Sequence, residues 1–192
     1  MGLDVISIIA TISLALIGYF MTYWNNLRIS KRQSKLDLIN KRISEFYGPL
    51  YVSTQASKRS FDAMKRQMGL DPGRLLKSGS VDKKLLEKWR IWLENVFMPI
   101  NDEIENLIVN HAYLILEEEM PECMLDFITH ISAYRAGLGG WKKGDPIEID
   151  SIIDYPKELD KYAANSYHIL KEEQLRLIGY MYNKKAKKKN SI

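Results

Sequence analysis

The sequence predicts an all-α membrane protein, with one N-terminal transmembrane helix that continues into a stalk and then a bundle of about four helices. A run of twenty uncharged residues stands near the N-terminus, and a basic stretch with an apolar heptad repeat follows it. The remaining segments space their apolar residues three or four apart, as amphipathic helices do. We expect a transmembrane helix at 1–24, a basic juxtamembrane stalk at 25–48, a helical bundle at 49–183 and a lysine-rich tail at 184–192.

The uncharged run extends from Val5 to Trp24. A helix of this length is about 30 Å long, which is the thickness of the hydrocarbon core of a bilayer. A secretory signal peptide is one alternative, but it has a positive N-terminal region and a cleavage site of small residues. Here Asp4 precedes the run and no Lys or Arg does. A buried core helix is the second alternative, and the membrane span is the interpretation we favour.

Basic residues gather on the C-terminal side of the run. Between residues 25 and 48, six Lys and Arg residues stand against two acidic ones, and the tail holds five lysines. By the positive-inside rule, the N-terminus should lie outside the plasma membrane and the domain in the cytoplasm. These two segments hold more than the whole net charge of +4, so the domain body is acidic. A protein that reads a nucleic-acid duplex with a basic folded face is therefore excluded.

Small residues line one face of the expected span, within an arc of about 80° at 100° per residue. Such faces let membrane helices approach closely. The apolar heptad repeat of the stalk starts on the same face. Together they predict a homo-oligomer seam formed by Ser7, Thr11, Ala15, Gly18, Thr22, Ile29, Leu36 and Ile43. The alternative is that the stalk face packs on its own domain, and Arg32 at an intervening heptad position weakens a tight dimer.

Proline and glycine residues mark the expected helix boundaries of the bundle. Gly48-Pro49 is expected to interrupt the first cytosolic helix, and Pro99 to kink a later one. We expect the four bundle helices from Leu50 to Met68, from Leu85 to Ile108, from Pro121 to the glycines at 137–141, and from Pro156 onward.

Four short strings resemble those of a group of bacterial helical-domain proteins, some membrane-anchored and some soluble, to which no activity is assigned. The strings are F-Y-G-P-L-Y (46–51), F-M-P-I-N (97–101), E-E-E-M-P-E-C-M-L-D-F (117–127) and Y-P-K-E-L (155–159). The resemblance covers roughly residues 46–178. It implies a bacterial or phage-related origin, and hence the bacterial inner membrane, but it assigns a role to no residue.

Positive and aromatic residues on the body are the best candidates for an anionic small ligand such as a nucleotide, through charge and stacking. They are Arg74, Lys77, Lys83, Lys84, Trp89, Arg135, Trp141, Lys142 and Lys143. A solvated loop surface is the alternative for this group. The spacing of Cys123, Asp126 and His130 puts them on one helix face, but no known metal-binding or catalytic spacing is present. We expect no metal, no cofactor and no enzymatic activity.

Three functions remain in view. The first is an oligomeric membrane effector whose cytosolic domain senses a ligand or partner; by analogy, bacterial antiviral defence systems contain proteins of this plan, including nucleotide-gated ones. The second is a non-enzymatic membrane tether or scaffold that recruits a protein partner. A hydrolytic enzyme is the weakest interpretation, because the required constellation of residues is missing.

Overall fold

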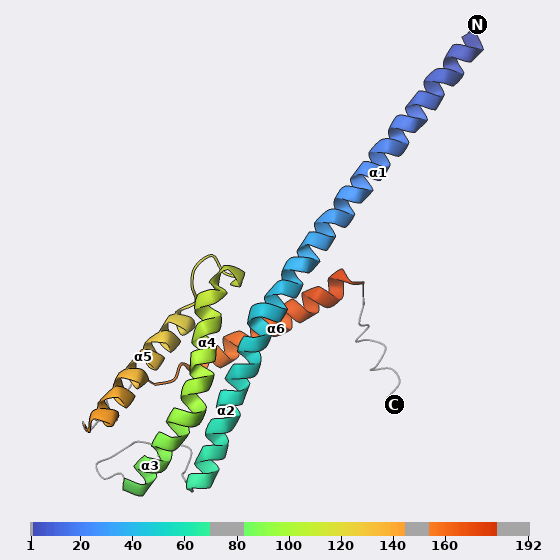
Figure 1. Ribbon diagram of the computed structural model, residues 1–192. Helices are drawn as coiled ribbons and strands as arrows, with labels where there is room; N and C mark the ends of the chain where they lie inside the picture. The colour runs from blue at the N-terminus through green and yellow to red at the C-terminus, as the bar shows by residue number, and fades with distance from the viewer. Residues whose placement is uncertain (1, 70–82, 145–153, 180–192) are drawn as a thin grey trace, which may run out of the picture. The chain divides into compact units, whose positions relative to one another are not determined.

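A computed structural model describes residues 2–69, 83–144 and 154–179, with side chains from Val5 and from Lys84 onward in the first two segments. All regular structure in these segments is helical, and they contain no strand (Figure 1). Adjacent elements join into four continuous helices, the first of which runs from the apolar N-terminal segment to Met68. The predicted all-α fold class is therefore confirmed.

The first helix comprises α1 (Gly2–Arg42), the π-helical turn η1 (Ile43–Tyr47) and α2 (Gly48–Met68). The prediction that Gly48-Pro49 interrupts this helix is wrong, because the helix continues through the proline. It ends instead at Gly69, whose φ of 66° lies in the left-handed region. Glycine adopts that conformation without the steric penalty of a Cβ atom, so it is a common end of a helix.

The second helix repeats this pattern, with α3 (Lys83–Trp92), the π turn η2 (Leu93–Phe97) and α4 (Met98–Asn110). A proline lacks the N–H for an ordinary helical hydrogen bond, and its ring clashes with the carbonyl four residues earlier. That carbonyl lies inside the π turn in both helices, and the turn closes over five residues, as where the Gly48 N–H donates to the Ile43 oxygen. The wider turn accommodates the proline that follows it without ending the helix.

The third helix, α5 (Glu122–Lys143), follows the 3₁₀ turn η3 (Ala112–Leu114). The prediction that this helix ends at the glycines of 137–141 is wrong, because the glycine run is helical. α5 ends at Gly144, which has a φ of 86° and donates its N–H to carbonyls of the last turn. The fourth helix is α6 (Lys157–Leu177), which begins just after Pro156 as expected.

The chain divides into two units, Met1–Asn40 with Glu173–Ile192, and Lys41–Glu172. In the second unit, α4 lies between α2 and α5 (Figure 1). The largest fully buried side chains of the core are Phe46, Tyr47, Leu50, Met64, Ile104, Ile108, Leu114, Met124, Phe127, Ile131, Leu159 and Leu170. Burying one such apolar side chain contributes roughly 1.5–3 kcal/mol. Phe46 and Tyr47, which we expected in the stalk, therefore belong to the core of the bundle.

Candidate functional site

The apolar segment of α1 is the first part of the candidate site. Every side chain from Val5 to Trp24 is exposed, and none of the most apolar stretch is buried inside the protein. Within this chain the segment is therefore not a core helix. It is long and apolar enough to cross a membrane, and a signal sequence near an N-terminus has the same properties.

Three hydroxyl groups in this segment donate to carbonyls of their own helix. Thr11 donates to the Ser7 carbonyl over 2.8 Å, and Thr22 donates to the Gly18 carbonyl over 2.9 Å. The Ser13 hydroxyl likewise donates to the Ile9 carbonyl over 2.8 Å. A polar group without a partner is costly in hydrocarbon, so these internal hydrogen bonds make the hydroxyls compatible with a lipid environment.

The predicted oligomer seam keeps its small residues on the surface. Ser7, Thr11, Ala15, Gly18 and Thr22 are all exposed, and a Cβ atom on Gly18 would meet nothing within 4 Å. Farther along, Ile29 is exposed, whereas Leu36 and Ile43 are half-buried. The membrane part of the seam is thus uncovered in the single chain, and its pairing with a second chain stays a prediction.

The stalk residues of the first unit contact the end of α6. Arg32 donates to the carbonyl oxygen of Leu177 through both Nε, at 2.6 Å, and a terminal nitrogen. The Lys35 ammonium lies 2.6 Å from a carboxylate oxygen of Glu173 and lowers the pKa of that carboxyl. Gln174 donates to the side-chain oxygen of Asn40 over 2.6 Å. These contacts join residues more than 130 positions apart, and no sequence pattern predicts them.

Among the candidate ligand residues near α3, the structure describes the side chains of Lys84 and Trp89. Arg74 and Lys77 lie outside the described residues, as does the side chain of Lys83. Lys84 is exposed on the first turn of α3. Trp89 is only 7% exposed and packs on Phe97, with 5.8 Å between the ring centroids. Trp89 is thus a core residue, and its ring has no free face to stack on a ligand.

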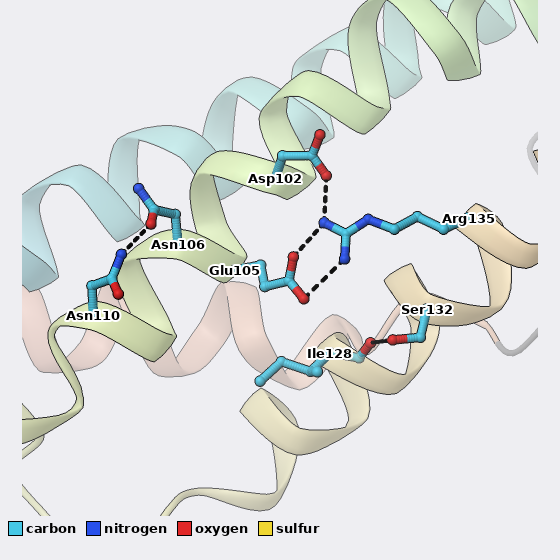
Figure 2. A network of polar contacts seen from close by, with 7 residues as sticks. All are labelled: Asp102, Glu105, Asn106, Asn110, Ile128, Ser132 and Arg135. Carbon is cyan, nitrogen blue, oxygen red and sulfur yellow. Dashed lines mark hydrogen bonds and ion pairs between the residues drawn. The ribbon is translucent and has the colours of Figure 1, made fainter.

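Arg135 is occupied by carboxylates of α4. Figure 2 shows its guanidinium between Asp102 and Glu105. A terminal nitrogen lies 2.7 Å from an Asp102 oxygen, and the guanidinium makes two contacts to Glu105. These hydrogen bonds, the one to Glu105 first, raise the pKa of Arg135 further above its usual value. The pairing joins α4 to α5 and neutralises the charge that we expected to attract an anionic ligand.

Trp141, Lys142 and Lys143 stand together at the end of α5. Both lysines are exposed, and Trp141 is half-buried. The guanidinium of Arg90, from α3, lies over the Trp141 ring at 5.9 Å from its centroid. This end of α5 is the only place in the described part of the chain where several of the predicted ligand residues lie side by side.

Sequence reasoning missed a chain of hydrogen bonds that starts at the fully buried Tyr47. The Tyr47 hydroxyl accepts from the Leu116 N–H over 2.9 Å and lies 2.9 Å from the Tyr162 hydroxyl. Tyr162 donates in turn to Glu117 over 2.7 Å. A carboxylate only accepts hydrogen bonds, so the single hydroxyl proton of Tyr162 is donated to Glu117. Tyr162 therefore accepts at its other contact, and Tyr47 is the donor there. The chain ties α6 and the connection before α5 to the π turn of the first helix.

The histidines and the cysteine do not gather into a reactive group. His130 is 4% exposed and packs on Tyr134, with 4.6 Å between the ring centroids. Cys123 is half-buried, and burial raises the pKa of its thiol, which disfavours the reactive thiolate. Within the described ranges, no three His, Cys, Asp or Glu side chains are placed so that they could hold a metal ion.

We found no match to the chain among known family models, curated proteins or solved structures.

Proposed function

We propose that this chain is a single-span membrane protein whose helical domain acts at the cytoplasmic face of a bacterial inner membrane as an oligomeric, non-enzymatic sensor and effector. One observation carries the proposal. A single continuous helix supplies both the exposed apolar segment and the buried core residues Phe46, Tyr47 and Leu50. A hydrogen-bonded helix is stiff along its axis. A change in packing around these core residues can therefore be transmitted along the same helix to the span.

The ligand side of the proposal rests on the end of α5. Exposed Lys142 and Lys143 beside the Arg90–Trp141 pair offer positive charge and a stacking surface, which suits an anionic small molecule such as a signalling nucleotide. Native mass spectrometry of the full chain with a nucleotide panel tests this part. We expect a bound species that is lost in Lys142→Ala/Lys143→Ala and kept in Lys157→Ala, which removes an exposed lysine from α6.

A membrane tether that recruits a protein is the second candidate. The burial of Trp89 and the carboxylate partners of Arg135 favour it, because they remove two of the residues expected to bind a small ligand. A protein that copurifies with the chain in the absence of any nucleotide supports the tether. A nucleotide-dependent change in self-association supports the effector.

The topology has a direct test. The basic flank after Trp24 predicts that a reporter active only in the periplasm stays silent when fused after Ile192. Membranes washed at alkaline pH should retain the full-length chain with its N-terminal segment attached. Cleavage of that segment, or a strong periplasmic signal, identifies a signal sequence and contradicts the anchor.

Cysteine crosslinking tests self-association, with Cys123 first changed to Ser to remove the native thiol. Single cysteines at Thr11 and Gly18 should crosslink between chains in membranes, whereas cysteines at Ile9 and Leu16, on the opposite face, should not. Gly18→Leu should weaken the crosslink at Thr11, because a bulky residue separates closely packed helices. Equal crosslinking around the whole helix contradicts the seam.

A further inference from the structure

The end of α6 is fastened to the stalk by three kinds of contact. The Arg32 guanidinium satisfies the carbonyl of Leu177 in the last turn of α6, where helical carbonyls otherwise lack a partner. Lys35 forms an ion pair with Glu173, and Asn40 accepts a hydrogen bond from Gln174. All of these contacts are polar and lie at the surface, so each is weak by itself and they can be broken together.

These contacts flank the apolar stripe of the stalk. At 100° per residue, Leu36 and Ile39 lie within the arc that Arg32, Lys35 and Asn40 cover on the helix. Ile39 is 3% exposed and Leu36 is half-buried, whereas Ile29, one heptad before Leu36 and outside the fastened stretch, is 58% exposed. Exposure of the stripe thus falls from Ile29 to Ile39 along the stretch that is flanked by the contacts with α6.

We propose that the end of α6 is an autoinhibitory cover over a surface that binds a second copy of this chain. The proposal rests on the self-association described above. The heptad spacing of Ile29, Leu36 and Ile43 is that of a coiled-coil face, and it continues the small-residue face of the span. A second chain and the end of α6 compete for Leu36 and Ile39, so release of α6 couples the state of the domain to pairing of the stalks.

The cover also accounts for Arg32, which stands where a coiled coil prefers an apolar residue. A charged residue there disfavours pairing of two stalks, while its guanidinium holds the Leu177 carbonyl in the single chain. Arg32→Leu removes both effects. It should therefore open the stripe and strengthen the pairing at once.

A charge swap tests the cover through the reactivity of a buried position. In a Cys123→Ser background, Ile39→Cys should react slowly with a maleimide reagent, and Leu38→Cys, on the exposed side, should react fast. We expect Glu173→Lys, which sets two ammonium groups against each other, to speed the reaction at position 39 by about threefold to tenfold. Lys35→Glu should do the same. The double variant Lys35→Glu/Glu173→Lys should restore the slow reaction, as a double-mutant cycle requires.

Glu172→Lys is the matched control. Glu172 is the exposed neighbour of Glu173 and has no ion pair within the described residues, so the same change of charge should leave the reaction at position 39 unaltered. Equal reactivity in Glu172→Lys and Glu173→Lys, or no rescue by the double variant, overturns the cover. A fast reaction at position 39 before any substitution overturns it as well.

The partner is tested by crosslinking of the full chain in membranes. A single cysteine at Leu36 should crosslink between chains more in Glu173→Lys than in the parent, and most in Arg32→Leu. If the stripe opens and this crosslink does not form, a second copy is not the partner. Chains with a single cysteine at Thr11 are crosslinked in parallel. If the crosslink at Thr11 is absent from the parent and from every variant, the proposed self-association is contradicted. If it is present while position 39 does not respond, the cover alone is contradicted.

Discussion

At the scale of single residues, a Cβ atom built on Gly48 would lie 2.5 Å from the carbonyl oxygen of Ile43, which is closer than real contacts allow. That carbonyl accepts the hydrogen bond that closes the π turn. Gly48→Ala should therefore force the turn to rearrange and destabilise the domain by about 1–3 kcal/mol, as overpacking does. Thermal unfolding of the full chain in detergent measures this.

Gly139→Ala is the control, because Gly139 lies inside α5 and its Cβ atom would meet nothing within 4 Å. Replacing a glycine inside a helix by alanine normally stabilises by about 0.5–1 kcal/mol. We therefore expect the same substitution to have opposite signs at the two positions. A stabilised Gly48→Ala variant would show that the π turn does not depend on the glycine.

Tyr47→Phe probes the chain of hydrogen bonds that starts at the buried Tyr47 hydroxyl. This substitution keeps the ring in the core and leaves the Leu116 N–H without its acceptor. The Tyr162 hydroxyl loses the hydrogen bond that it accepts from Tyr47 but keeps the one that it donates to Glu117. A buried polar group that loses its partner costs roughly 1–3 kcal/mol, which urea unfolding should detect. Tyr113→Phe is the control, because its exposed hydroxyl makes one contact of 3.2 Å to Glu45 and its loss should change stability by less than about 0.5 kcal/mol.

At the scale of elements, Arg135 joins α4 to α5 by binding two carboxylates at once (Figure 2). Its side chain is 44% exposed, so Arg135→Gln should destabilise by no more than about 1 kcal/mol, and less at high salt. Arg135→Lys should not restore the loss, because an ammonium cannot reproduce the planar fork of a guanidinium. Unfolding of Glu105→Gln and of the double variant completes the cycle, in which additive effects would contradict the pairing.

At the scale of the whole molecule, four tyrosines, one fully buried and three half-buried, make the domain sensitive to alkali. Burial raises the pKa of Tyr134 to about 12 and also raises the pKa values of Tyr47, Tyr155 and Tyr162. In the unfolded chain these groups ionise near pH 10, so unfolding releases their protons above that pH. Stability should be unaffected by them below about pH 10 and should fall from about pH 10 to 12.

A titration followed by tyrosinate absorbance and helicity measures this effect. Some of the eleven tyrosines should ionise only as the helical signal is lost, and Tyr134→Phe should make the fall in stability shallower. Ionisation of all eleven in one step, with helicity unchanged, would contradict the burial of these hydroxyls.

The sequence by itself determined the all-α fold and the apolar N-terminal helix. Both depend on local properties: the spacing of apolar residues along a helix, and the absence of charge over a membrane-length run. Each of these properties can be read from a window of about twenty residues, without information on which other segments pack against it. The helix that begins just after Pro121 and the one that begins just after Pro156 follow from the same kind of local signal.

Only the tertiary structure decided how the two prolines are accommodated and what the charged residues do. Pro49 continues its helix because a π turn precedes it, and whether a turn closes over four or five residues depends on the packing around Phe46 and Tyr47. Arg135 resembles a ligand-binding cation in the sequence, but its partners stand 30 and 33 positions away. Arg32 resembles a flaw in a coiled coil, yet its partner stands 145 positions away. Periodicity records which face of a helix is apolar, whereas the partner of a charge is set by the folding of distant segments onto one another.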